Sequence, residues 1–403
     1  MTTIASPAVH PRARREVGLP PWPERLAWLL AGVAASAGLV GVVWRFSAGH
    51  AAADYGSYVP WGLWVAAYIT FVGASAGAFA FAAFIFSTRR LELYRLAVLA
   101  MLVALGTFVA GMVNVWLDLG HPFRAWRLLT NTSVGSVMGV MAWFYAIYGV
   151  ILVGGLWSAR KGAVPRIMER YAWLAILFAV VFAGAEGSLF GVVGAQPTWE
   201  SGLTPVVFLI EGALFGLSLV AAAGALFKVL APETARRLGQ ALLALLVALV
   251  VVEAAELYTG LRAAVPAKQH AFEAVLTGDY WWVFWVFHLA LGIVLPAVLL
   301  LRARSRAALI GAAGAIIAAM ALASKLNLVV PALAAHEDID GLGAAFTGPG
   351  LVYDYFPSTM EWLVTVGTFG AAALIVLAGR LVLRKPLAGG AADSSLVATQ
   401  EGV

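Results

Sequence analysis

Residues 59–86 read VPWGLWVAAYITFVGASAGAFAFAAFIF, and no charged side chain interrupts this run. About 20 apolar residues are enough for an α-helix to cross a bilayer core of roughly 30 Å. The run therefore predicts a membrane-spanning helix that is tilted or extends past the hydrocarbon. Nine further apolar runs follow the same pattern, at 26–46, 93–117, 134–157, 171–194, 205–230, 241–261, 281–302, 306–331 and 359–383. We expect an all-α integral membrane protein with about ten transmembrane helices.

The composition supports a membrane protein and excludes several kinds of site. Of the 403 residues, 62% are hydrophobic and 12% are charged, whereas roughly 25% are charged in soluble domains. The chain has no cysteine, which excludes a cysteine-ligated iron–sulfur cluster, a disulfide and a thiol nucleophile. Four of the six histidines lie in expected tails or loops, so no axial pair for a haem is predicted. We expect no haem, iron–sulfur cluster or metal in this chain, and no nucleic-acid partner.

The basic residues set the expected orientation. If the N-terminus lies inside, 20 of the 26 Lys and Arg residues fall in inner loops and tails, against four in the outer loops. This asymmetry is typical of cytoplasmic loops, so both termini are expected in the cytoplasm of a prokaryotic inner membrane. The first apolar run is too long for a signal peptide.

A faint internal similarity suggests two four-helix bundles, because Pro60 and Pro205 each precede a helix that enters from the outer side. Parallel repeats of this kind occur in membrane proteins. The expected organisation is a cytoplasmic tail (1–25), a first helix with an outer loop (26–58), two four-helix bundles (59–194 and 195–331), an outer acidic loop with the last helix (332–383) and a second cytoplasmic tail (384–403).

Ionisable residues inside the expected helices all fall in the outer half of the membrane. Such residues are costly in lipid and are functional candidates. One-sided polarity fits a reaction centre near the outer surface, with a proton path, better than an alternating-access transporter. In the alternative interpretation, Glu253 or Glu256 forms a structural bridge with His288 or Lys325, and we expect Lys325 to snorkel to the interface. The candidate proton path consists of Glu186, Glu211, Glu253, Glu256 and His288.

Residues 114–127 read NVWLDLGHPFRAWR and place polar side chains beside tryptophans at the outer boundary. A quinone head group needs hydrogen-bond partners at its two oxygens, a proton acceptor and an apolar slot. Asp118 and His121 are candidates for the hydrogen bond and the proton transfer. An interface anchor in which Asp118 caps the helix or pairs with Arg124 explains the same residues.

The run YGSYVPWGLWVAAY at 55–68, followed by GASAGAF at 73–79, resembles the NrfD/PsrC family of membrane subunits. WLDLGHP at 116–122 is similar to a stretch of that family, in which Asp118 matches an acid near the quinone. The resemblance implies a helical subunit that binds menaquinone or ubiquinone near the outer face. It also implies electron exchange with an extracytoplasmic iron–sulfur subunit, often linked to a molybdopterin catalytic subunit.

The sequence departs from the family pattern where some members carry a histidine quinone ligand, because residues 59–61 read VPW, and His121 stands where arginine is common. We expect Asp118 and His121 to act in catalysis, with Tyr58, Trp61, Asn114, Trp116 and Arg124 around the quinone. Glu337, Asp338, Asp340 and Asp354 in the 332–358 loop are a candidate docking surface. A transporter for a small organic ion and a structural membrane anchor are the alternatives.

Overall fold

The computed structural model describes residues 21–383, except 134, 161–165, 195, 197, 264 and 335–352. This part of the chain contains helices and no strand, and ten helical spans are long and apolar enough to cross a membrane. The prediction of an all-α integral membrane protein is confirmed. The spans are α1 (Trp22–Ala48), α2 (Leu63–Ser87), α3 (Tyr94–Asp118), α5 (Val137–Arg160), α6 (Arg166–Gly191), α7 (Thr204–Leu226), α8 (Pro232–Leu261), η4 (Val283–Val294) with α10 (Leu295–Ala303), α11 (Ala307–Ala334) and α12 (Thr359–Val382).

Shorter helices lie between the spans: η1 (His50–Ala52), η2 (Leu91–Leu93), η3 (Pro122–Arg124), α4 (Arg127–Thr130) and α9 (Pro266–Thr277). Helix α9 was not predicted from the sequence, because it is too short and too polar to resemble a span. The predicted start of the α8 span, residue 241, lies nine residues after its observed start at Pro232. The first turns of α8 are polar, and Arg236 and Arg237 each approach Glu233 to 2.8 Å. Hydropathy therefore detects only the later, apolar part of this helix.

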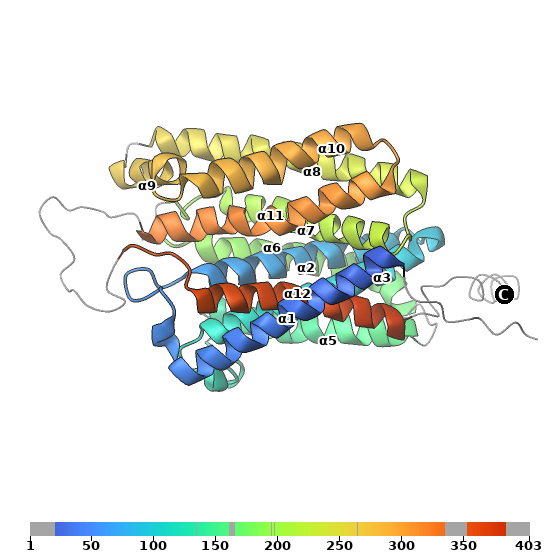
Figure 1. Ribbon diagram of the computed structural model, residues 1–403, viewed down its shortest axis with the longest axis horizontal. Helices are drawn as coiled ribbons and strands as arrows, with labels where there is room; N and C mark the ends of the chain where they lie inside the picture. Colours follow the sequence, from blue (N-terminus) through green and yellow to red (C-terminus); the bar gives the residue numbers. More distant parts are fainter. Residues whose placement is uncertain are drawn as a thin grey trace, which may run out of the picture.

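The helices run along one common axis, and α1 begins at the same end of the bundle at which α12 finishes (Figure 1). Arg380 Nη1 lies 2.5 Å from the buried carboxylate of Glu24, so an ion pair joins the two helices there. The opposite end carries α9 (Figure 1). The cytoplasmic location of the first end stays a prediction, and residues 1–20 and 384–403 of the expected tails lie outside the described residues.

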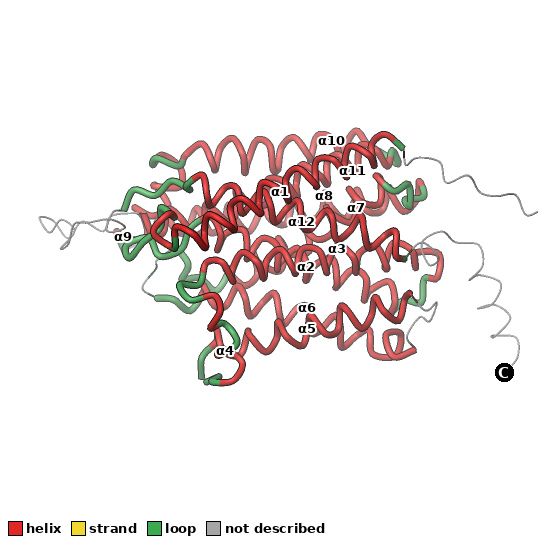
Figure 2. The backbone as a smooth tube through the Cα atoms, turned by 60° about the horizontal axis from the view of Figure 1, so that its bottom comes forward, coloured by secondary structure: helices red, strands yellow, loops and turns green. Residues whose placement is uncertain are grey.

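Helix α2 occupies the centre of the bundle, and 20 of its 25 residues are buried. It packs against α3, α7 and α6, and Figure 2 shows α3 on one side of α2 and α6 on the other. Helix α5 completes the first group through α3 and α6, while α7, α8, α10 and α11 pack together as a second group. The α1–α12 pair lies against α3. The division of the chain into two four-helix bundles at residue 194 stays a prediction.

Glycines let α2 and α7 approach at the level of their backbones. A Cβ atom added to Gly77 would overlap the carbonyl of Gly212, and one added to Gly216 would overlap the backbone of Ala78. Gly73 faces Gly212 in the same crossing. Spacing of small residues by four positions is the usual way in which membrane helices pack closely. The contact fixes how the two helical groups meet.

A buried hydrogen-bond network ties α2 to α3 and α5. Ser75 Oγ lies 2.8 Å from the Tyr148 hydroxyl and donates to the carbonyl of Ala104 at 2.7 Å. Tyr148 also approaches the Ser75 carbonyl at 3.0 Å. Polar groups buried in a membrane protein need such partners, so these bonds fix the rotation of α5 against α2.

The glycine crossing generates a first prediction. Gly77→Ala should destabilise the folded protein by about 1–3 kcal/mol, because the new methyl group overpacks a backbone contact. Gly154→Ala is the matched control, since a Cβ atom on Gly154 meets no other atom within 4 Å. The measurement is the midpoint of thermal unfolding in detergent, followed by tryptophan fluorescence. Equal midpoints for the two variants would contradict the packing argument.

Candidate functional site

The largest cavity among the described residues has a volume of about 1080 Å³ and lies between α2, α3, α5 and α6. Aromatic and aliphatic side chains form most of its wall, with Trp61 and Trp116 at the end that holds α4. The carboxyl and hydroxyl groups in the lining belong to Asp118, Tyr68 and Tyr145. The cavity therefore offers an apolar slot with a few polar groups.

Helix α5 forms the outer wall of this cavity and packs loosely. Only seven of its 24 residues are buried. Val150 and Val153 line the cavity and are 73% and 57% exposed. Exposed apolar residues in a membrane span face lipid. The cavity is thus continuous with the surface that contacts the acyl chains.

Asp118 is the last residue of α3 and lies at the cavity wall. Its Oδ1 atom is buried and has no hydrogen-bond partner among the described residues. The end of α3 is held separately, because the buried Arg45 guanidinium donates to the carbonyls of Leu117 and Leu119, each at 3.1 Å. A buried acceptor without a partner is costly, so this carboxyl is available to a ligand.

His50 and Tyr55, in the connection between α1 and α2, lie beside Asp118. His50 Nε2 is 2.9 Å from the Asp118 main-chain carbonyl and 2.8 Å from the Tyr55 hydroxyl. The Tyr55 hydroxyl in turn interacts with the Asp118 carboxyl. Neither residue was predicted as a site residue from the sequence, where Tyr55 is part of the 55–68 motif and His50 is one of the histidines in the expected loops. No sequence pattern connects residue 50 with residue 118.

Burial determines the protonation states of His50 and Tyr55. Desolvation lowers the pKa of His50 below its usual value, and the nearby Arg45 charge acts in the same direction, while the hydrogen bond to Asp118 acts against them. Burial raises the pKa of Tyr55 far above its usual value, and the Asp118 and Glu361 carboxyls add to this effect. At neutral pH the imidazole is therefore uncharged and the phenol is protonated.

Tyr355 and Glu361 join the start of α2 to the start of α12. The Tyr355 hydroxyl donates to Glu361 Oε1 at 2.6 Å and accepts from the Leu63 amide at 2.7 Å. Trp64 Nε1 donates to the Glu361 carbonyl at 3.1 Å. A Cβ atom on Gly62 would overlap the Tyr355 ring. Burial and the Glu361 carboxyl raise the pKa of Tyr355, so this tyrosine stays a hydrogen-bond donor.

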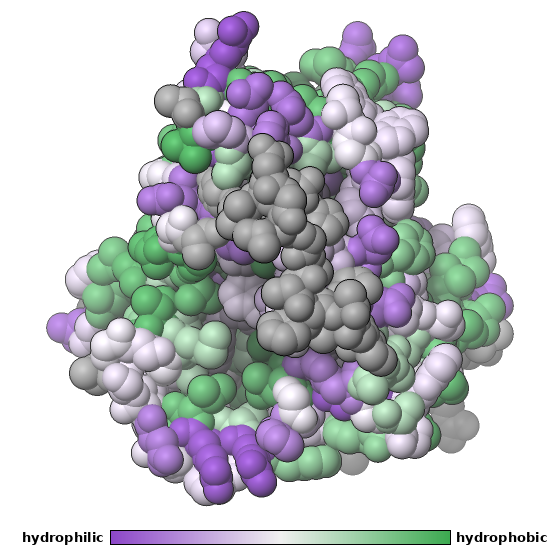
Figure 3. Space-filling model, turned by 90° about the vertical axis from the view of Figure 1, so that its left-hand side faces the viewer, coloured by the Kyte–Doolittle hydropathy of each residue, from purple (hydrophilic) through white to green (hydrophobic). Residues whose placement is uncertain are grey.

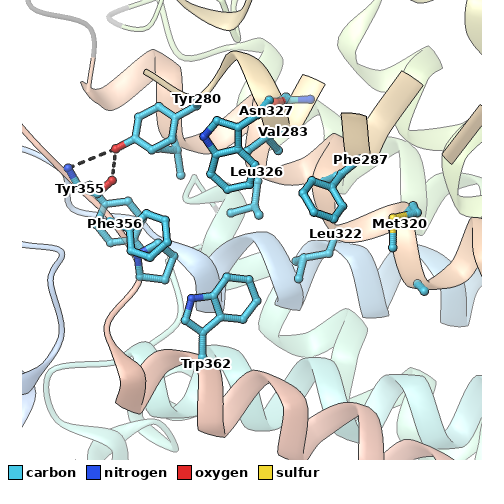
Figure 4. Close-up of a pocket in the computed structure, with 15 residues that line it drawn as sticks. Tyr280, Val283, Phe287, Met320, Leu322, Leu326, Asn327, Tyr355, Phe356 and Trp362 are labelled. Carbon is cyan, nitrogen blue, oxygen red and sulfur yellow. Dashed lines mark hydrogen bonds between the residues drawn. The ribbon is translucent and has the colours of Figure 1, made fainter. Parts of the chain in front are cut away.

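A second cavity of about 310 Å³ lies between η4, α11 and α12 and has an aromatic wall (Figure 4). At one end the Tyr280 hydroxyl donates to the Tyr355 carbonyl and accepts from the Tyr355 amide (Figure 4). Burial raises the pKa of Tyr280. The Asn327 side chain lines the cavity, and its amide atoms are buried without a partner among the described residues.

Asn327 also lines a third cavity of about 220 Å³, which contains four of the five residues of the candidate proton path: Glu211, Glu253, Glu256 and His288. His288 Nε2 lies 3.0 Å from Glu253 Oε2, which is the bridge that the alternative interpretation allowed. His288 sits in the π-helix η4, a rare geometry that is frequent at functional sites.

Lys325 also lines this third cavity, and its ammonium group pairs with Glu211. The expectation that Lys325 snorkels to the interface is wrong. The residue is 3% exposed, and its Nζ atom lies 3.3 Å from the centre of the Phe208 ring. The carboxylate and the ring together replace water around the ammonium group.

Glu186, the fifth residue of the candidate path, lies outside this cavity and is fully buried. Neither of its oxygens meets a hydrogen-bond partner at bonding geometry among the described residues. Its carboxyl interacts electrostatically with Tyr68 and with Lys325. Tyr68 hydrogen-bonds Tyr145 in the wall of the largest cavity. Glu186 therefore lies between the largest cavity and the charged cluster.

The remaining predicted site residues are distributed differently. Tyr58 stacks on Tyr353 with ring centres 4.8 Å apart. Asn114 faces α12, where its Nδ2 donates to Thr368 Oγ1 at 2.9 Å. His121 and Arg124 are exposed and line a separate hollow of about 360 Å³ beside η3. None of these four predicted residues lines the largest cavity in the described part of the chain.

Most of the predicted acidic docking surface lies outside the described residues. This holds for Glu337, Asp338 and Asp340, whereas Asp354 is described and exposed. Figure 3 shows this end of the molecule, where hydrophilic and hydrophobic residues are both exposed. Among the described residues, no three His, Asp or Glu side chains are grouped to hold a metal ion.

Comparisons with known proteins identify the family. The family model described as "Polysulphide reductase, NrfD" matches residues 53–335. The chain is 29% identical to one of the subunits of selenate reductase from Mesobacillus selenatarsenatis, over 87% of this chain and 92% of the relative. It is 26% identical to the Hdr-like menaquinol oxidoreductase integral membrane subunit of Archaeoglobus fulgidus, over 80% of this chain and 84% of the relative. The chain therefore belongs to the NrfD family of polysulphide reductase membrane proteins.

Proposed function

We propose that this chain is the quinone-reactive membrane subunit of a respiratory oxidoreductase complex. The observation that carries the proposal is the largest cavity, which is apolar, continuous with the lipid-facing surface and lined by Asp118, whose Oδ1 atom has no hydrogen-bond partner among the described residues. The names of the relatives support a membrane subunit of an oxidoreductase, and one of them is named for menaquinol.

The residues around the cavity fit a quinone. Its head group is a flat apolar ring that suits aromatic and aliphatic walls, and Trp61 and Trp116 supply such a wall. A quinone supplies two-electron, two-proton chemistry when it is bound. Asp118 would hold a hydrogen bond to the head group and exchange its proton, and Tyr68 and Tyr145 bring hydroxyl groups to the same cavity.

Electrons must leave or enter through another protein, because this chain has no cysteine to hold an iron–sulfur cluster. The proposed partners are an extracytoplasmic iron–sulfur subunit and a molybdopterin-type or other catalytic subunit. They would dock at the end that carries α9, where Asp118 lies. Because the largest cavity lies close to that end, the distance for electron transfer between the quinone and the docked partner would be short.

The charged cluster of the third cavity is proposed as a proton path. His288 and Glu253 are hydrogen-bonded there, and Oε1 of Glu256 is buried without a partner among the described residues. Glu186 stands between this cluster and Tyr68 at the quinone cavity. Intramembrane acids arranged in series are typical of proton relays, so the arrangement supports coupling between the two cavities.

Asp118→Asn should weaken binding of a menaquinol-analogue inhibitor to the detergent-purified chain about tenfold or more, because a charge-assisted hydrogen bond contributes roughly 1.5–3 kcal/mol. The measurement is a titration followed by tryptophan fluorescence, to which Trp61 and Trp116 report from the cavity wall. The matched control is Asp279→Asn, an exposed aspartate at the same end.

A second variant tests the space in the cavity independently of the Asp118 carboxyl. Ala142→Phe fills the cavity from α5 and leaves Asp118 intact, so it should abolish saturable quenching in a folded sample. If saturable quenching were unchanged in both Asp118→Asn and Ala142→Phe, the quinone would have to bind at another site. No saturable quenching in wild type would favour a structural anchor or a transporter.

The proton path generates a separate prediction. Glu253→Gln with Glu256→Gln should leave inhibitor binding unchanged and reduce proton movement per electron when the complex turns over in sealed vesicles. Glutamine keeps the size of each side chain and removes the titratable proton. Glu233→Gln, on the exposed first turn of α8, is the control. Unchanged proton movement in the double variant would refute the proposed path.

A further inference from the structure

We propose that Tyr55 and His50 carry protons between the Asp118 carboxyl and the water at the end of the bundle that holds α9. His50 is then the terminal proton carrier of the quinone reaction, and the inference rests on the proposed quinone site. The three groups come from different parts of the fold: His50 from η1, Tyr55 from the connection to α2, and Asp118 from the end of α3.

The order of these groups runs from the cavity to the surface. Asp118 lines the cavity and interacts with the Tyr55 hydroxyl. Tyr55 is 5% exposed, and its hydroxyl lies 2.8 Å from His50 Nε2. His50 is half-buried, so part of the residue is accessible at the surface. Tyr55 and His50 are at hydrogen-bonding distance, so a proton can pass between them without movement of the backbone.

The surrounding contacts hold the relay in place. The Tyr55 ring packs edge-on against Trp64, with ring centres 6.0 Å apart, and against His50 at 4.9 Å. Arg45 fixes the carbonyls at the end of α3 through two hydrogen bonds. Groups that transfer protons must be held at hydrogen-bonding distance, and these contacts provide that restraint.

His50 Nε2 has two neighbours that require opposite protonation states. Without a proton, Nε2 accepts a hydrogen bond from the Tyr55 hydroxyl. With a proton, Nε2 donates to the Asp118 main-chain carbonyl at 2.9 Å. A neutral imidazole has one donor and one acceptor nitrogen, and both are donors once it is charged. The ring therefore has a partner before and after it takes up a proton.

In quinol oxidation, protons and electrons leave by separate routes. The quinol loses two protons and two electrons, and the electrons pass to the iron–sulfur partner. Asp118 takes one proton at a time from the quinol oxygen and passes it to the Tyr55 oxygen, while the Tyr55 proton moves to His50 Nε2. The imidazolium then loses a proton to water, and exchange with solvent restores the first tautomer. Quinone reduction runs the same transfers in reverse.

The charged and polar groups around His50 are compatible with an imidazole that accepts a proton. Arg45 on α1 disfavours a second positive charge, whereas the Asp118 carbonyl on α3 favours it. Tyr55 faces the ring from the connection to α2, and Glu361 on α12 acts on Tyr55. Burial lowers the pKa of His50, so the ring is neutral near pH 7 and ready to accept a proton.

A purely structural role is the competing explanation, since the imidazole also covers a carbonyl at the end of α3. The experiment uses the complex purified through a tag on this chain, with menadiol as electron donor. His50→Ala should slow quinol oxidation by about 10²-fold, the lower range for a positioned proton-transfer group. Imidazole added to the medium should restore much of the rate, which no structural role explains.

Tyr55→Phe keeps the ring contacts and removes the hydroxyl, so it should slow the reaction to a similar extent without rescue by imidazole. The acidic limb of the wild-type pH profile, where the rate falls as His50 becomes protonated, should disappear in His50→Ala. His270→Gln, an exposed histidine on α9, is the control. Inhibitor binding should be unchanged in all three variants.

The outcomes separate this inference from the proposed function. Absence of inhibitor binding in wild type would refute the quinone site itself. Retained binding with an unchanged rate and pH profile in His50→Ala would overturn the relay alone. A slower rate that imidazole does not rescue would assign His50 a structural role and also overturn it. Loss of the acidic limb in His121→Gln instead of His50→Ala would transfer the role to His121.

Discussion

The backbone contact between α2 and α7 is the constraint on which the rest of the structure depends. Gly77 and Gly216 remove the side chains that would otherwise separate these helices, and lipid supplies no hydrophobic force to bring them together. Close approach lets van der Waals contacts hold the two helical groups side by side. Helix α2 then presents Tyr68 to the largest cavity, while α7 holds Glu211 in the charged cluster.

At one end of the bundle, buried charged groups are paired with nearby side chains. Glu211 meets Lys325, and Glu253 meets His288. Glu361 receives hydrogen bonds from Tyr355 and from the amides of Asp54 and Ser358, at 2.6–3.1 Å. Each pairing lowers the cost of placing a carboxyl away from water. Asp118 Oδ1, Glu186 and Glu256 Oε1 are the exceptions among the described residues.

The number of helices and their approximate limits could be predicted from the sequence, because hydrocarbon thickness fixes a length that composition reveals. Asp118, Trp61 and Trp116 were also predicted, and all three line the largest cavity. Helix rotation is less visible in a uniformly apolar sequence. The sequence therefore did not reveal that Asn114 faces α12 and not the largest cavity. His50 could not be found, because its contact with Asp118 spans 68 residues and depends on how α1 and α3 end together.

The loose packing of α5 has a consequence for how the protein meets its substrate. A cavity whose wall continues into the acyl chains, past Val150 and Val153, exchanges its contents by lateral diffusion within the bilayer. The relevant concentration is then that of the membrane pool and not that of the aqueous phase. In the proposed function, the isoprenoid tail of a quinone would stay in lipid while the head group enters, so the tail would contribute little to selectivity. Affinity can remain modest without limiting occupancy, and changes in lipid composition become changes in substrate supply.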